Sequence, residues 1–91
     1  MKDKRAVALM YAQHSTAPRV VAKGAGFMAQ VIEQRAKEHD IPVAIEPELV
    51  ELLVQLDLNS LVPPELYAAV AEVLAWAFEV DGRTADDLKD G

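Results

Sequence analysis

The stretch 18–39 constrains the fold more than any other part of this sequence. It opens with the β-branched pair Val20 and Val21, which suit a pleated strand. A Gly-Ala-Gly turn at 24–26 follows, and glycine permits an abrupt change of direction because it has no Cβ. The next segment, 27–37, carries apolar residues at helical spacing. Strand, glycine turn and helix together predict the first half of a βαβ unit.

Two more apolar segments complete the predicted sheet. Residues 6–11 form a nearly continuous apolar run, which predicts a strand buried on both faces. A helix is the competing interpretation, because alanine, leucine and methionine favour helices. We expect this strand to lie antiparallel to the strand at 19–23, with the loop 13–18 between them. A right-handed crossover through the helix would place 43–45 as a third strand, parallel to the second.

Prolines predict where the remaining helices begin, because proline is tolerated in the first turn, where its missing N–H costs nothing. Pro47 opens a short helix that is apolar around much of its surface, and the Pro-Pro pair at 63–64 opens a last helix. Asp81–Gly82 would end that helix, leaving 83–91 as a flexible charged tail. The predicted fold class is α/β: a single domain over residues 1–82, with a small mixed sheet of about three strands packed by three helices in the order β-β-α-β-α-α.

Composition narrows the classes of function. The chain has 91 residues and a net charge of −6, which disfavours nucleic-acid binding and docking on anionic lipid. It has no cysteine, so a disulfide, a thiolate zinc site and a cysteine nucleophile are excluded. We read no signal peptide and no apolar run long enough for a membrane span, and therefore expect a cytoplasmic protein.

The glycine turn is the first candidate for a ligand site. Backbone N–H groups at 24–26, with Lys23 beside them and a helix behind them, could cradle a phosphate. Glu46 lies about where a ribose-binding acid is expected. However, Ala29 occupies the third glycine position of such a motif. We therefore favour a structural turn, with a small nucleotide- or anion-binding protein as the alternative.

Other chemistry-bearing residues are sparse. His14 and His39 lack histidine partners at i+4, and Ser15 and Thr16 lack the third member of a nucleophilic triad. We therefore expect no catalytic residues, no metal and no cofactor. Trp76 lies off the main apolar stripe of the last helix, where it either covers an edge of the core or marks a partner surface.

Two motifs are specific in combination: an Ala-Lys-Gly-x-Gly turn and a Pro-x-Glu-Leu-Tyr helix start. With the segments around them, they resemble the cytoplasmic domain of the FlhB/YscU family of type III export proteins. The resemblance covers roughly Arg5 to Phe78, and the matching segments are 6–11, 17–26, 41–43, 46–49 and 62–76.

The resemblance implies a function in protein export, and this sequence departs from the family pattern in two ways. Family members are membrane proteins whose cytoplasmic domain takes part in switching export from rod-, hook- or needle-type substrates to later ones, and cleaves itself at an Asn-Pro-Thr-His motif. This sequence has Met1 to Lys4 where that motif is expected, and its only asparagine is Asn59, followed by Ser60. Since the cleavage needs an asparagine side chain, we expect a free-standing relative without the membrane part and without self-cleavage.

The function implied by this resemblance is a non-enzymatic interaction module of the flagellar or type III export apparatus. It would modulate export substrate specificity by pairing with, or competing with, the cytoplasmic domain of a full-length relative, because an open sheet edge is a template for an added strand. Its partners would be export proteins rather than nucleic acid or a membrane. The predicted partner contacts include the exposed part of the last helix and the residues Arg19, Lys23, Gly24, Gly26 and Trp76.

Overall fold

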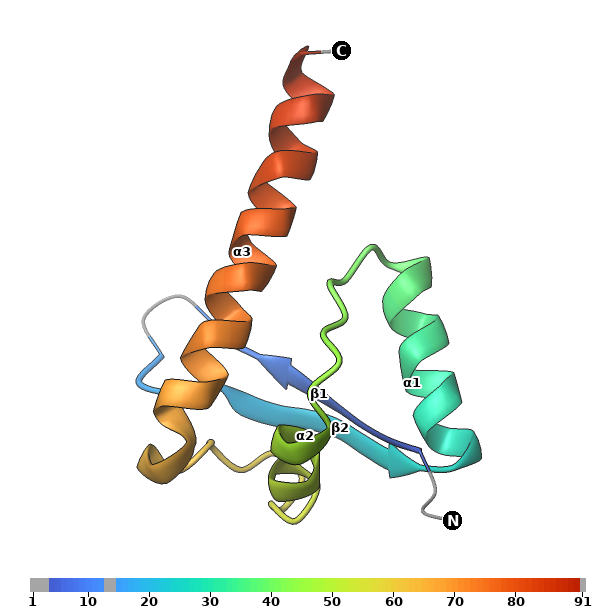
Figure 1. The fold of residues 1–91 in the computed structure, drawn as a ribbon, viewed down its shortest axis with the longest axis vertical. Helices are drawn as coiled ribbons and strands as arrows, with labels where there is room; N and C mark the ends of the chain where they lie inside the picture. Colours follow the sequence, from blue (N-terminus) through green and yellow to red (C-terminus); the bar gives the residue numbers. More distant parts are fainter. Residues whose placement is uncertain (1–3, 13–14, 91) are drawn as a thin grey trace.

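The elements of the fold follow one another as two strands and then three helices (Figure 1). A computed structural model describes the backbone of residues 4–12 and 15–90, and the side chains of these residues as far as Asp81. The elements are β1 (Arg5–Met10), β2 (Arg19–Ala25), α1 (Phe27–Glu38), α2 (Pro47–Leu53), the short 3₁₀ helix η1 (Pro64–Leu66) and α3 (Tyr67–Asp90). The α/β class, the three helices and the antiparallel pairing of the first two strands are confirmed.

The β1–β2 ribbon has one face of small side chains, which lies against α1. Ala6 is opposite Gly24, and Ala8 is opposite Ala22. A Cβ on Gly24 would lie 2.7 Å from the Cβ of Met28 in α1. The glycine therefore lets the helix approach the strand more closely than any other residue would.

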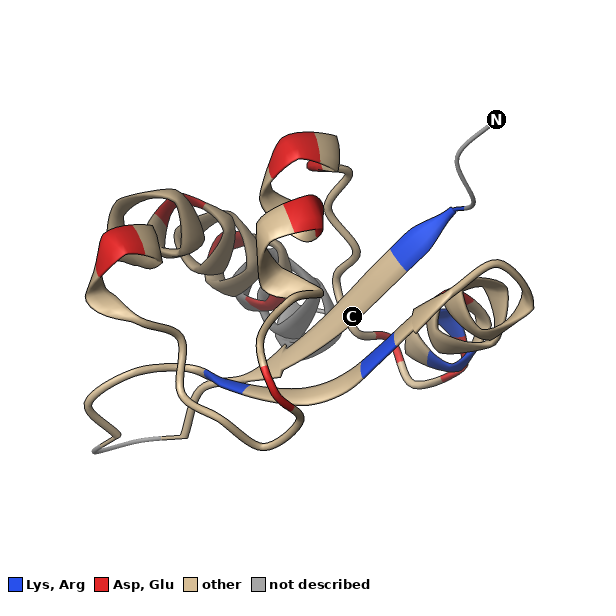
Figure 2. Cartoon of the chain, turned by 90° about the horizontal axis from the view of Figure 1, so that it is seen from below, with Lys and Arg blue, Asp and Glu red and all other residues tan. Residues whose placement is uncertain are grey.

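The opposite face of the ribbon carries larger side chains and holds the core. Val7 and Leu9 pack there against a buried cluster of Leu53, Val62 and Val70, which come from α2, the following connection and α3. Burial of each such side chain contributes about 1.5–3 kcal/mol. Figure 2 shows the resulting layers, with α1 on one side of the ribbon and α2 and α3 on the other.

The second edge of β2 is covered near its start by the connection 59–62. The N–H of Val20 donates to the carbonyl of Ser60 at 3.0 Å, and the N–H of Val62 donates to the carbonyl of Pro18 at 2.8 Å. The sequence did not indicate this pairing, because 59–62 reads as a simple connector. Within the described residues β1 has β2 as its sole strand partner, so its other edge is open.

The predicted third strand at 43–45 is wrong. The described residues contain a two-stranded sheet, and 41–46 is a connection without regular secondary structure between α1 and α2. The position beside β2 that a parallel third strand would occupy is taken, near its start, by the connection 59–62. Pro42 and Pro47 also remove backbone donors at both ends of the segment.

Helix α1 ends at its C-terminus in a Schellman turn. The N–H of Ile41 donates to the carbonyl of Ala36 at 2.8 Å, and the N–H of Asp40 donates to the carbonyl of Lys37 at 3.2 Å. Asp40 adopts φ 56°, the left-handed conformation that this turn requires and that glycine adopts most easily.

Helix α3 continues beyond its predicted end. Asp81–Gly82 does not stop it, and the helical backbone runs to Asp90. A glycine inside a helix costs about 1 kcal/mol relative to alanine, which weakens a helix without ending it. Although α3 has 24 residues, no helix in the described part of the chain is both long and apolar enough to cross a bilayer.

Candidate protein-docking site

An apolar groove of about 360 Å³ lies between α3 and the connection from β1 to β2. Figure 1 shows α3 rising from the ribbon beside this connection. No charged side chain among the described residues lines the groove, so these walls suit apolar groups of a partner. The lining consists of Tyr11, Thr16 and Pro18 from the connection and Tyr67, Val70, Ala71, Leu74, Ala75 and Phe78 from α3.

The groove combines a buried floor with an aromatic rim. Val70 is 1% exposed and belongs to the core cluster, whereas Phe78, Tyr11 and Tyr67 are 58%, 44% and 42% exposed. Large aromatic side chains that are anchored next to a well-packed core often contribute most of the energy of a protein interface. Such a combination of a buried floor and an exposed aromatic rim is frequent at protein-contact surfaces.

The sequence reason for this rim is an apolar stripe on α3 that extends past the core. Val70, Leu74 and Phe78 follow each other at i+4 spacing and so share one face of the helix. Val70 and Leu74 pack in the core, and Phe78, one turn further on, is exposed. The sequence predicted partner contacts on the exposed part of the last helix, but not at Thr16 and Pro18, because nothing local in the sequence shows that these residues face α3.

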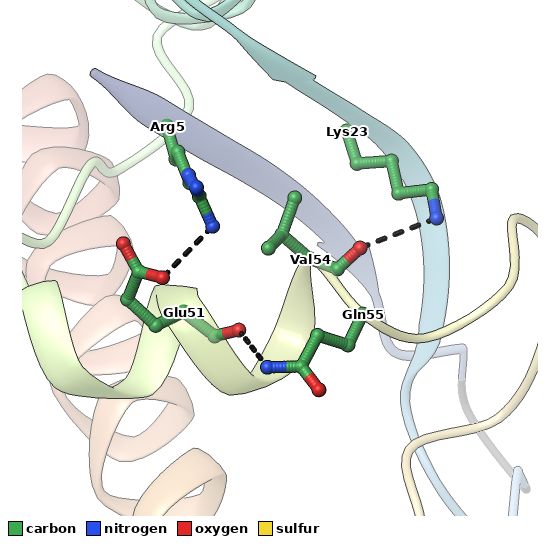
Figure 3. Close-up of polar contacts among 5 residues, drawn as sticks. All are labelled: Arg5, Lys23, Glu51, Val54 and Gln55. Carbon is green, nitrogen blue, oxygen red and sulfur yellow. Dashed lines mark hydrogen bonds and ion pairs between the residues drawn. The ribbon is translucent and has the colours of Figure 1, made fainter. Parts of the chain in front are cut away.

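Two of the predicted partner contacts, Arg19 and Lys23, make hydrogen bonds within the domain. A guanidinium nitrogen of Arg19 donates to the carbonyl of Asn59. Lys23 Nζ donates to the carbonyl of Leu56 at 2.7 Å and to that of Val54 at 3.2 Å; Figure 3 shows the second bond. These carbonyls follow the end of α2, where helices leave acceptors unpaired.

The two glycines among the predicted contacts shape the turn before α1. Gly24 lies under Met28, and Gly26 adopts φ 59° while its N–H donates to the carbonyl of Lys4 at 2.7 Å. Trp76, the fifth predicted contact, is 40% exposed and lines a second hollow beside α3. The groove lining therefore includes none of the five predicted residues.

Ion pairs join both faces of the ribbon to the helices that lie against them. Arg5 Nη1 lies 2.8 Å from an oxygen of Glu51 in α2, and Gln55 Nε2 donates to the Glu51 carbonyl at 3.1 Å (Figure 3). On the other face, Lys4 Nζ lies 2.8 Å from Glu33 in α1. Adjacent residues at the start of β1 thus bind helices on opposite faces, as alternation along a strand requires.

Comparison with known sequences identifies relatives over most of the chain. The profile of the FlhB HrpN YscU SpaS Family matches residues 3–77. The flagellar biosynthetic protein FlhB of Salmonella typhimurium is 43% identical over 76 residues, which cover 81% of this chain and 20% of FlhB. YlqH of Bacillus subtilis is 38% identical over 79 residues, which cover 86% of this chain and 85% of YlqH. This chain thus spans about a fifth of the length of the FlhB relatives it matches.

Comparison with solved structures identifies relatives in the same family. The crystal structure of the cytoplasmic domain of FlhB from Shewanella putrefaciens superposes with a TM-score of 0.81 at 32% identity, covering 90% of this chain and 69% of that one. The fold described above is thus similar to that of the matched part of this cytoplasmic domain. The chain belongs to the FlhB HrpN YscU SpaS family and is related, through it, to the flagellar and type III export apparatus.

Proposed function

We propose that this chain is a non-enzymatic docking module of the flagellar or type III protein export apparatus. The observation that carries the proposal is the groove between α3 and the β1–β2 connection, in a chain of an export family. Among the described residues, the lining contains no carboxylate, histidine or lysine, which are common groups for acid–base chemistry. The same lining is suited to exclude water from an apolar contact.

The size of the groove indicates what kind of partner it takes. A volume of about 360 Å³ accommodates a few side chains of a docked segment rather than a folded domain. Phe78 and Tyr67 would cover such a segment from α3, and Tyr11 would cover it from the connection. The partner is therefore a short apolar stretch of a protein that belongs to, or passes through, the export apparatus.

The open edge of β1 supports a second part of the proposal. Within the described residues β1 is paired on one edge only, and an unpaired edge can accept a strand from another chain. That strand would come from the cytoplasmic domain of a full-length FlhB relative. By pairing with this domain or competing with it, the chain would modulate the substrate specificity of export.

Calorimetric titration tests the groove. The purified chain is titrated with the cytoplasmic domain of FlhB from the same organism and, separately, with a hook-type export substrate. Phe78→Ser should weaken binding of the partner about tenfold or more, since it removes a rim aromatic. Phe27→Ser is the matched control, because Phe27 is 75% exposed on α1 and lies outside the groove. Failure of both titrations, or equal binding by both variants, would contradict the proposal.

Secretion in cells tests the modulation of specificity. Overproduction of the chain should change the ratio of hook-type to filament-type proteins in the culture medium, because it competes for the same export components. Overproduction of the Phe78→Ser chain, at equal abundance, should leave the ratio nearer that of the parent strain. An unchanged ratio with the unaltered chain would refute modulation while leaving the binding measured by calorimetry intact.

A further inference from the structure

A second hollow, of about 430 Å³, lies between α3 and the connection from α1 to α2. Figure 1 shows this connection descending beside α3, opposite the β1–β2 connection that borders the groove. The two sites share no lining residue. The hollow is lined by Val43, Ala44, Ile45 and Glu46 from the connection and by Glu72, Val73 and Trp76 from α3.

The connection presents a row of apolar side chains to solvent. Ile41, Val43 and Ile45 are 56%, 39% and 87% exposed, whereas Pro42 and Ala44 between them are less exposed. Such alternation of exposure is that of an extended chain in which every second side chain faces solvent. Within the described residues, the backbone of 43–45 makes no hydrogen bond. The segment therefore has both the side-chain pattern and the free backbone groups of an unpaired strand, to which another strand can be added.

Among the described residues, the charged side chains that line the hollow are of one sign. The sequence from Glu46 to Asp81 contains eight carboxylate residues and neither lysine nor arginine. Figure 2 shows acidic segments on α2 and α3, whereas the basic segments lie on the strands and on α1, which carries acidic segments as well. Both charged residues of the lining, Glu46 and Glu72, are carboxylates, and neither forms an ion pair with any residue that the structure describes. The hollow is thus apolar inside and negative at its rim.

We propose that this hollow docks an extended segment of a partner protein in which apolar side chains alternate with lysine or arginine. The backbone of the segment would pair with 43–45, and its apolar side chains would cover Val43 and Ile45. A cationic side chain would lie against the ring of Trp76, close to the carboxylates of the rim, where cation–π attraction and charge pairing act together. This surface is independent of the groove and of the function proposed for it.

The fluorescence of Trp76 tests the proposal directly, because Trp76 is the only tryptophan of the chain and lines the hollow. The probe is a short synthetic peptide of alternating valine and arginine or lysine, with blocked ends. Titration should change the Trp76 emission to saturation, with an affinity that falls as salt is added. A peptide with glutamate in place of each basic residue should give no saturable change.

Variants then place the peptide in the hollow. Ile45→Ser should abolish the change in emission, and it should leave the fold intact because Ile45 is 87% exposed, which circular dichroism checks. Glu72→Gln should weaken binding by about three- to fivefold, the effect of one partly exposed ion pair. Glu65→Gln is the matched control, since Glu65 is exposed and does not line the hollow.

The results of these experiments distinguish a basic extended segment from other occupants of the hollow. Absence of any change with the basic peptide, equal binding of the acidic peptide, or full binding by Ile45→Ser would overturn the proposal. A second copy of this chain is the competing occupant. In that case the Trp76 emission would depend on protein concentration before peptide is added, and sedimentation would show a dimer. That result would also overturn the proposal.

Discussion

Lys23 Nζ donates a hydrogen bond of 2.7 Å to the carbonyl oxygen of Leu56. The two residues are far apart in the sequence, and the bond joins β2 to the chain that leaves α2. The second bond of the same ammonium, to Val54, satisfies another carbonyl at the end of that helix. Lys23 therefore acts as a cap supplied by a strand, and it links the end of α2 to the ribbon.

Lys23→Met should lower the free energy of unfolding by about 1–2 kcal/mol, since charge-assisted hydrogen bonds to carbonyls are lost while the aliphatic stem is kept. Urea denaturation followed by circular dichroism measures the change. Lys37→Met is the control, because Lys37 is exposed on α1, and it should shift stability by no more than about 0.5 kcal/mol. Equal effects of the two substitutions would exclude the capping role.

Gly24→Ala should destabilise the domain by about 1–3 kcal/mol, because the added Cβ would lie 2.7 Å from the Cβ of Met28 and would push α1 off the ribbon. The measurement is the thermal unfolding midpoint. Ala25→Ser changes the exposed neighbouring position and should cost little. A stable Gly24→Ala variant would mean that α1 and β2 do not make this close contact.

Asp40→Gly should stabilise the domain by about 1 kcal/mol, because Asp40 holds φ 56° at the end of α1 and glycine adopts this conformation without a Cβ penalty. Chemical denaturation gives the value. At His39, the adjacent residue with φ −106°, the same change to glycine should instead destabilise, since it adds only freedom to the unfolded chain. A loss of stability in Asp40→Gly would argue against the Schellman turn.

The Arg5–Glu51 pair should contribute less than about 1 kcal/mol, because both side chains are about one-third exposed. A double-mutant cycle with Arg5→Met and Glu51→Gln isolates this coupling from the effects of the single changes. The coupling should shrink in 1 M salt, where charges are screened within about 3 Å. A coupling unaffected by salt would show that the contact is not governed by charge.

The segment from β2 through the glycine turn to α1 could be predicted because its signals are local. The β-branched side chain of Val20 indicates a strand, and Gly26 supplies the positive φ of the turn. The helical spacing of apolar residues after the turn indicates α1. The segment 43–45 carries an equally good strand pattern, yet it is unpaired. A strand needs a partner edge, and the free edge of β2 is covered near its start by 59–62. A local stretch of sequence cannot show this competition between distant segments.

The residues of the groove likewise divide into those that local spacing predicts and those that it does not. The apolar stripe through Val70, Leu74 and Phe78 can be read from its spacing, and so can the family to which the chain belongs. That Thr16 and Pro18 form the facing wall, and that Lys23 bonds the end of α2 instead of facing solvent, was decided by the tertiary structure alone. The sequence by itself determined which segments are strand, turn and helix start, because these depend on neighbouring residues. Which surfaces meet depends on contacts between residues distant in the chain, and only the packed fold decides among them.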